Sequence, residues 1–201
     1  MFFYLVTGIA LGLSSGVSPG PLFALVLSVT LNYGKQEGIK VALSPLISDI
    51  PIIIVSFFII DTFANSDVVY GILALVGGLF IGFLAVDSLR MKDIKVTTQL
   101  KTHSLKKGVI TNMLNPAPYI FWITVGIPTV VKGYEQSLLH ALLFVIPFYI
   151  MLVGSKILIA ILVAKTGHIN PKLMRYINIV LGLVLLGLAG KFIYDGIIYL
   201  L

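Results

Sequence analysis

The sequence predicts an all-α integral membrane protein of six transmembrane helices, arranged as a 3+3 inverted-topology repeat. Hydrophobic residues make up 58% of the 201 positions and charged residues only 11%, whereas a soluble domain carries about 25% charged residues. Apolar stretches long enough to cross a bilayer recur along the chain, and its two halves share helix-breaking motifs. We therefore expect a single transmembrane domain over residues 1–201, with half-repeats at 1–90 and 108–201 and a cytoplasmic connector at 91–107.

A hydrocarbon core of about 30 Å needs roughly 20 apolar residues in one helical span. The stretches that meet this requirement cover residues 2–31, 40–60, 68–90, 109–131, 137–164 and 173–195. Turn-forming residues separate them, such as Gly34 and Gly38 after the first stretch and Pro171 after the fifth. The N-terminal stretch lacks the basic segment and the small-residue cleavage site of a signal peptide, so we expect it to remain as the first helix.

The distribution of basic residues predicts how the helices are oriented. Eleven of the 14 Lys and Arg residues lie in the connectors after the first, third and fifth helices, whereas Lys132 and Lys191 lie toward the opposite side. Cytoplasmic connectors carry an excess of Lys and Arg. The odd-numbered connectors are therefore predicted in the cytoplasm, and both termini outside the cytoplasmic membrane. The charged run at 90–107 is explained as this topology signal, and no polar domain remains to bind nucleic acid.

Two proline motifs are the basis of the predicted repeat. The motif Ser18-Pro19-Gly20-Pro21 in the first helix is matched by Asn115-Pro116-Ala117-Pro118 in the fourth. Glycines five residues apart also recur, at Gly77 and Gly82 in the third helix and at Gly182 and Gly187 in the sixth. Together with Gly71 and Gly78 we expect them to form close-packing surfaces. Because each half has three helices, the second half must enter the membrane from the opposite side, as in many secondary transporters.

The proline pairs predict a break near the middle of the first and fourth helices, because a proline removes a backbone hydrogen bond and clashes with the preceding turn. Freed backbone groups are tolerated in a bilayer where they are packed inside the protein or line a cavity. A single proline is explained as a kink, whereas matched pairs predict a substrate cavity between the halves. Ser18, Asn112 and Asn115 are expected at this cavity, although Ser and Asn also join helices in membranes.

Two ionisable residues are predicted at matching depths within the membrane. Asp49 in the second helix and Lys156 in the fifth each lie about nine residues, or about 13 Å, from the cytoplasmic end of the helix. Charges are strongly disfavoured there and are functional candidates by default. We expect the two side chains to pair and to exchange partners with a proton or with the substrate. The alternatives are a structural ion pair and a Lys156 side chain that extends to the headgroups.

Signals for enzymes and cofactors are weak. The chain has no cysteine, which excludes disulfides, thiolate metal sites and thiol redox chemistry. It has no P-loop, Gly-x-Ser-x-Gly or His-Glu-x-x-His motif, and its histidines do not have metal-ligand spacing. We therefore predict that the protein is not an enzyme and needs no cofactor.

Three longer motifs accompany the proline pairs and Asp49: Gly12-Leu-Ser-Ser-Gly16-Val-Ser18-Pro19-Gly20-Pro21, the Gly34-x3-Gly38 connector that leads to Asp49, and Gly108-x3-Asn112-x2-Asn115-Pro116. In their order and spacing they resemble the lysine exporter (LysE) family, including its homoserine and threonine exporter (RhtB-type) relatives. The resemblance covers essentially the whole chain. It implies export of amino acids or similar metabolites across the cytoplasmic membrane, driven by a proton gradient or by the membrane potential.

Two positions depart from the family pattern. Ala117 stands where family members commonly have lysine, and Pro45 stands where glycine is frequent. The first departure removes a cation that could contact a carboxylate, and the second adds a kink. The expected partners are a small-molecule substrate, the lipid bilayer, a coupling proton and, in a homo-oligomer, further copies of the chain.

Three other functions fit the sequence less well. A thiol–disulfide shuttle of the same superfamily needs a cysteine in each break, where this chain has Gly20 and Ala117. A divalent-cation exporter would need carboxylates within several helices, and Asp87 lies near the cytoplasmic end of the third. A non-transporting scaffold has no use for the matched breaks.

Overall fold

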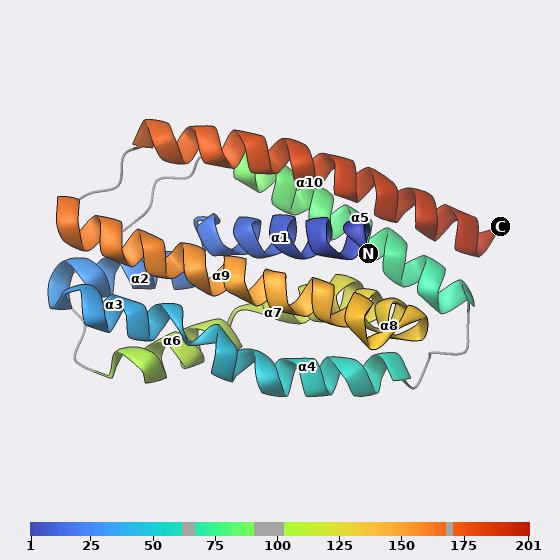
Figure 1. Ribbon diagram of the computed structural model, residues 1–201, viewed down its shortest axis with the longest axis horizontal. Helices are drawn as coiled ribbons and strands as arrows, with labels where there is room; N and C mark the ends of the chain where they lie inside the picture. The colour runs from blue at the N-terminus through green and yellow to red at the C-terminus, as the bar shows by residue number, and fades with distance from the viewer. Residues whose placement is uncertain (62–66, 91–102, 168–170) are drawn as a thin grey trace.

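A computed structural model describes residues 1–61, 67–90, 103–167 and 171–201, and the described residues form helices joined by short turns. The helices are α1 (Phe2–Val17), α2 (Pro21–Tyr33), α3 (Lys35–Ala42), α4 (Pro45–Asp61), α5 (Asp67–Leu89), α6 (Ser104–Met113), α7 (Pro116–Phe121), the π-helical turn η1 (Trp122–Gly126), α8 (Ile127–Gln136), α9 (Leu138–Thr166) and α10 (Pro171–Leu200). Figure 1 shows them as a bundle with nearly parallel axes.

Four continuous segments are long and apolar enough to span a membrane. They are Lys35–Ile60, Val68–Leu89, Leu138–Thr166 and Arg175–Leu200. Two bent pairs of helices also qualify, α1 with α2 and α6 with the segment Pro116–Gln136, so the described residues contain up to six spans. The all-helical membrane fold predicted from the sequence is therefore confirmed.

The predicted breaks in the first and fourth spans are present, with bends of 56° and 57°. At the first break Ser18 and Gly20 have extended backbone, and Pro21 is the first residue of α2. At the second break Asn115 is extended, and Pro116 is the first residue of α7. A residue that precedes proline is sterically driven out of the α region, and proline suits the first turn of a helix. The X-Pro steps therefore end one helix and start the next.

The second span has a turn that the sequence analysis placed only as a kink at Pro45. Here α3 ends at Ala42 and α4 begins at Pro45, with Leu43 and Ser44 in the turn between them. This span also begins at Lys35, five residues before the predicted start at residue 40.

Glycines bring α1 and α9 into backbone contact. A Cβ atom on Gly8 would lie 2.4 Å from the carbonyl oxygen of Phe144, and one on Gly12 would lie 2.3 Å from that of Phe148. Small residues allow transmembrane helices to approach this closely. Because α1 belongs to the first half of the chain and α9 to the second, this contact joins the halves at the centre of the bundle.

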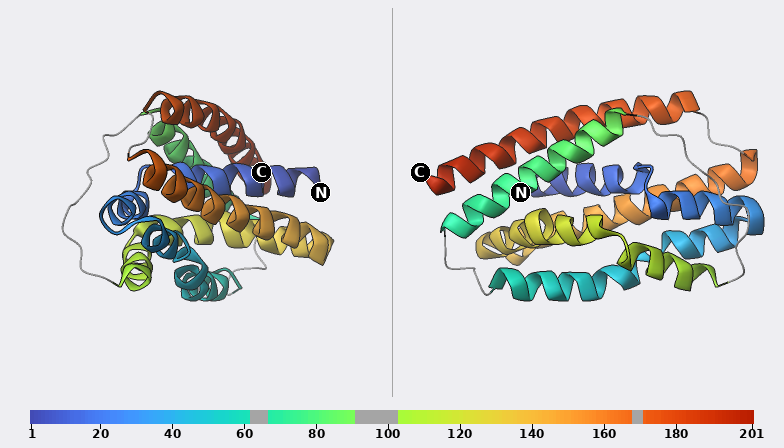
Figure 2. Two further views of the ribbon diagram at one scale, coloured as in Figure 1. Left: turned by 60° about the vertical axis from the view of Figure 1, so that its left-hand side comes forward. Right: turned by 180° about the vertical axis from the view of Figure 1, so that it is seen from behind.

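A second pair, α5 and α10, lies side by side in the view from behind in Figure 2 and also packs through glycines. A Cβ atom on Gly78 would lie 2.7 Å from Ile193 Cγ1, and one on Gly182 would lie 2.8 Å from Leu89 Cγ. The packing role predicted for these glycines is therefore confirmed. For Gly187 the prediction is wrong, because this residue is exposed on the outer face of α10 with no atom within 4 Å of its Cβ position.

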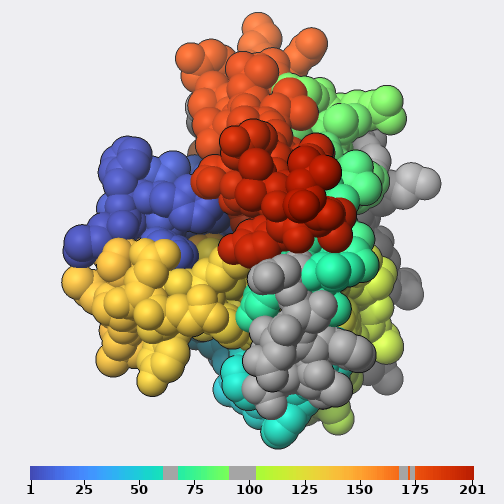
Figure 3. Space-filling view, turned by 90° about the vertical axis from the view of Figure 1, so that its right-hand side faces the viewer, coloured from blue at the N-terminus to red at the C-terminus, as the bar shows by residue number. Residues whose placement is uncertain are grey.

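Both termini lie at the same end of the bundle, together with the junction of α8 and α9. Figure 3 shows that end, where the start of α1, the α8–α9 junction and the last turns of α10 meet. The turn between α2 and α3, the helix α6 and the last turns of α9 lie at the opposite end (Figure 1). We call the end with both termini the terminal end. We call the opposite end the basic end, because Lys35, Lys106 and Lys165 lie there.

Candidate functional site

A cavity of about 210 Å³ lies where the two helix breaks meet. We call it the central cavity. Most of the residues predicted for the substrate site line its wall: Ser18, Gly20, Pro21, Asp49, Asn112, Asn115, Pro118 and Lys156. The other two, Pro19 and Pro116, are not at the wall. They belong to the X-Pro steps that shape the breaks.

The Asp49 carboxyl group is buried on the cavity wall, with the residue only 4% exposed. The Asn112 amide nitrogen donates hydrogen bonds to Asp49 Oδ1 (2.8 Å) and to Ser48 Oγ (2.7 Å). The Tyr149 hydroxyl donates to Asp49 Oδ2 (3.1 Å). The indole of Trp122 lies beside the same carboxyl group. Groups from α4, α6, α9 and η1 therefore meet at one acidic side chain.

Lys156 is buried as well, with 2% of the residue exposed, and its ammonium group contacts the end of α1. Its Nζ atom donates to the carbonyl oxygens of Ser15 (2.7 Å) and Gly16 (3.2 Å). The last carbonyls of a helix lack partners within the helix and carry its negative dipole end. The ammonium of Lys156 thus caps α1 immediately before the first break.

The predicted ion pair between Asp49 and Lys156 is absent: the two side chains share the cavity but have different partners. The cause is the packing of α1 against α9. A Cβ atom on Gly16 would lie 1.8 Å from Ser155 Oγ, so the end of α1 sits directly beside Lys156. The alternative in which Lys156 extends to the headgroups is also wrong, because its ammonium is held inside the bundle.

The two breaks differ in how the next helix begins. The Asn115 side chain caps α7, because its Oδ1 atom accepts a hydrogen bond from the Ala117 amide (3.1 Å). Gly20 is the N-cap residue of α2, and it has no side chain that could cap the helix. Leu22 and Phe23, whose amides follow in the first turn of α2, line the central cavity. The first helical amides of a helix have no partners within it, so this half of the cavity is favourable for an anionic group.

Three residues of the site were missed by the sequence analysis: Tyr149, Trp122 and Ser48. Tyr149 precedes Lys156 by seven residues, or two turns, which places both on one face of α9, and this spacing was a usable signal. Ser48 adjoins Asp49 in the sequence. No local pattern marks Trp122, whose position depends on the π-helical turn that it begins.

In the part of the chain that the structure describes, no group of three or more His, Cys, Asp or Glu side chains is arranged to hold a metal ion. The charged groups at the central cavity are instead of mixed sign. Asp49 and Asp87 are acidic, and Lys156 is basic.

No curated protein and no solved structure matches the chain. A family model described as LysE type translocator matches residues 13–196, which include both helix breaks, Asp49 and Lys156. Members of this family are membrane transporters. The chain therefore belongs to the LysE type translocator family.

Proposed function

We propose that the protein is a secondary-active exporter of amino acids or related small metabolites across the cytoplasmic membrane, of the RhtB type. The observation that carries this proposal is a small central cavity between two helix breaks whose wall includes a buried carboxyl group and a buried ammonium group. Both charges are strongly disfavoured inside a bilayer unless they serve a pathway or are fully paired.

The cavity has the size and charge pattern of a site for a zwitterion. Its volume of about 210 Å³ is below the range of about 300–1,000 Å³ that is usual for drug-sized ligands. The Asp49 carboxyl group can accept hydrogen bonds from a substrate ammonium. An ammonium group has three donors, and Lys156 uses two of them on α1, so one remains for a substrate carboxylate.

The uncapped start of α2 provides further donors on the wall beside Gly20. Amides at the start of a transmembrane half-helix commonly face anionic substrate groups in secondary transporters. The buried ammonium of Lys156 also repels cations, which is why we prefer a zwitterion to the divalent cation of the alternative function.

Coupling to protons is assigned to Asp49. A proton on Asp49 removes the charge that attracts the substrate ammonium, so protonation and substrate binding compete for one carboxyl group. A proton that binds from outside and is released to the cytoplasm would then drive one solute outward. The bends of 56° and 57° in two spans support a 3+3 inverted-topology repeat around this site. The excess of basic residues at one end supports a cytoplasmic location for that end, with both termini outside.

Transport by the purified full chain in proteoliposomes tests this function. Vesicles are loaded with one of a panel of labelled amino acids, and efflux is measured with and without an imposed proton gradient. We expect a subset of the neutral, zwitterionic amino acids to leave faster when the gradient drives protons inward. The proposal would be contradicted if every amino acid left the vesicles at the rate measured in protein-free liposomes, whatever the gradient. Transport of Co²⁺ or Cd²⁺ by the same vesicles would then favour the divalent-cation exporter.

A further inference from the structure

We propose that Trp122, seated on Gly126 by the π-helical turn η1, is the gate between the central cavity and the terminal end of the bundle. In this role its indole also limits the size of the solute that passes. This inference rests on the proposed function and deepens it, because it names the residue that controls one side of the same pathway.

Two separate cavities lie along the span formed by α7, η1 and α8. The central cavity reaches Phe121 and Trp122. A second cavity of about 50 Å³, which we call the outer pocket, begins with Thr124 and includes Thr129 and Lys132 of α8. Along this span, the linings of the two cavities follow one another across the π-helical turn, from Trp122 to Thr124. In the proposed pathway, a solute that moves from one cavity to the other passes the side chains of η1.

Aromatic rings pack around Trp122 at the wall of the central cavity, and we place the barrier there. Trp122 is 2% exposed. Its indole stacks on the Tyr149 ring at 6.2 Å between centroids and meets the Phe148 ring edge-on at 5.7 Å. The Phe121 ring lies 5.3 Å away. Since the indole and Tyr149 also adjoin Asp49, the barrier contacts the acidic group of the central cavity directly.

The local backbone is suited to a movement of this ring. A π-helical turn carries one more residue than an α-helical turn and is frequent at functional sites. Conversion of η1 to α-helix would shift the register by one residue, which turns the Trp122 side chain by about 100° around the helix. The indole therefore has two defined positions, one of them in the barrier.

Gly126 is required for the closed position. A Cβ atom on Gly126 would lie 2.3 Å from Trp122 Cε3, so the indole fills the space of the missing side chain. The neighbouring backbone is constrained by α5, where a Cβ atom on Gly77 would lie 2.6 Å from the Thr124 carbonyl oxygen. A methyl group on Gly126 can therefore be accommodated only if the ring moves.

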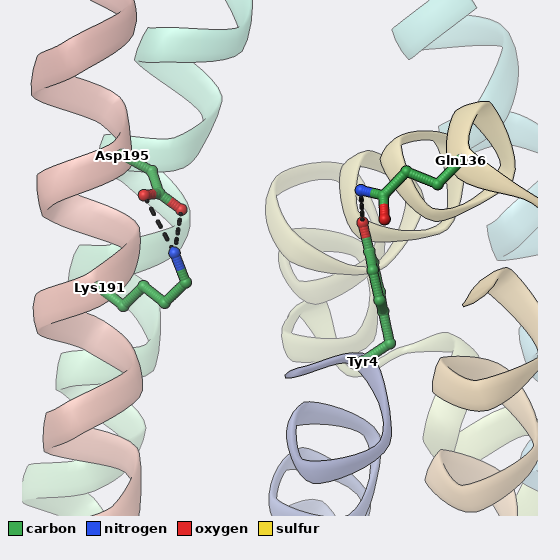
Figure 4. A network of polar contacts seen from close by, with 4 residues as sticks. All are labelled: Tyr4, Gln136, Lys191 and Asp195. Atoms are coloured by element: carbon green, nitrogen blue, oxygen red, sulfur yellow. Dashed lines mark hydrogen bonds and ion pairs between the residues drawn. The ribbon is translucent and has the colours of Figure 1, made fainter. Parts of the chain in front are cut away.

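Polar contacts hold the terminal end closed beyond the gate. The Gln136 side chain of α8 donates to the Tyr4 hydroxyl of α1 at 2.9 Å, as Figure 4 shows. The Lys132 ammonium lies 4.1 Å from the centroid of the Tyr199 ring of α10. These contacts tie α8 to helices of both halves, so opening the passage requires them to separate.

The chain is well suited to the test because Trp122 is its single tryptophan and it has no cysteine. The test variant is Gly126→Ala, and the matched control is Gly187→Ala, the same change at an exposed glycine with open space around it. Tryptophan emission and its quenching by acrylamide are measured in the full chain in proteoliposomes. We expect a red-shifted, more strongly quenched emission for Gly126→Ala and no change for Gly187→Ala.

A second readout reports whether the passage is open. Leu84→Cys places a thiol on the wall of the central cavity, and a membrane-impermeant methanethiosulfonate is added from the side of the termini. We expect Gly126→Ala to raise the labelling rate at least about tenfold, which corresponds to about 1.4 kcal/mol in the opening equilibrium. Trp122→Phe should raise it less than Trp122→Ala and should widen the range of exported amino acids toward larger side chains.

Equal emission and equal labelling in the Gly126→Ala and Gly187→Ala proteins would overturn the gate. So would a Trp122→Ala protein whose labelling rate equals that of the parent. Neither readout requires a transported solute. A chain that exports no amino acid but shows the expected changes in emission and labelling would therefore overturn the proposed function while leaving the gate supported.

Discussion

The Asp49 carboxyl group receives hydrogen bonds from α6 and α9 while it is itself part of α4. A buried carboxyl group with donors from several helices is sensitive to small movements of any of them. Protonation weakens the bond from Tyr149, because a protonated oxygen is a poorer acceptor than a carboxylate. The state of one proton can therefore change how α4 and α9 are held together.

The substitution Asp49→Asn tests this role with little change in shape. We expect solute exchange and proton-driven efflux both to fall at least about tenfold, since the substrate loses a charge-assisted contact of about 1.5–3 kcal/mol. Proteoliposome assays measure both rates. Glu135→Gln is the control, because Glu135 is an exposed acidic residue that lies away from the central cavity. Unchanged export by the Asp49→Asn protein would contradict the assignment.

Lys156→Met should lower stability as well as transport. The substitution leaves the Ser15 and Gly16 carbonyls without their ammonium partner, and buried groups that lose a hydrogen-bond partner cost about 1–3 kcal/mol. Thermal unfolding in detergent should show a lower midpoint than for Lys165→Met, which removes an exposed lysine from the same helix. Equal midpoints for the two proteins would show that the capping contact does not contribute.

At the scale of the helices, α1 and α9 depend on glycine for their close approach. Gly12→Ala would place a methyl group 2.3 Å from the Phe148 carbonyl oxygen, which cannot move without the helix. Overpacking of this kind costs typically about 1–3 kcal/mol. We expect a lower unfolding midpoint for Gly12→Ala than for Gly154→Ala, whose Cβ position on α9 is in open space. The reverse order would argue against backbone contact between the two helices.

The helix breaks were predictable because their cause is local. An X-Pro step restricts the residue before it whatever the rest of the chain does, so Ser18-Pro19, Gly20-Pro21 and Asn115-Pro116 indicated both breaks. The π-helical turn at Trp122–Gly126 has no such local cause. It accompanies contacts between helices, among them the approach of Gly77 to Thr124. A sequence pattern therefore predicts a break caused by a local proline, but it does not predict a π-helical turn that depends on contacts between helices.

The same distinction applies to the site. That Asp49 and Lys156 would lie inside the membrane followed from their depth in apolar stretches. The hydrogen-bond partners of these two side chains could not be predicted from the sequence. Lys156 contacts the carbonyl groups of α1, and not Asp49, because the glycines of α1 bring that helix close to α9. Asn112 and Asn115 were expected at the cavity, but the cap that Asn115 provides to α7 depends on side-chain geometry.

At the scale of the whole molecule, orientation is open to a direct test. Glu135→Cys places a thiol at the terminal end, and Lys165→Cys places one at the basic end, both at exposed positions. In intact cells an impermeant maleimide should label Glu135→Cys, whereas Lys165→Cys should react only after permeabilisation. The cysteine-free parent provides the background. Labelling of Lys165→Cys in intact cells would reverse the orientation and therefore the direction assigned to export.

The contacts of α1 with α9 and of α5 with α10 limit the kinds of motion that the bundle allows. Each pair takes one helix from either half, and glycines bring its backbones close together. Rocking of one intact half against the other would tear both pairs apart. The moving units must therefore combine helices of both halves, so that α1 moves with α9 and α5 moves with α10. The helices on the far side of the proline breaks then move relative to these pairs.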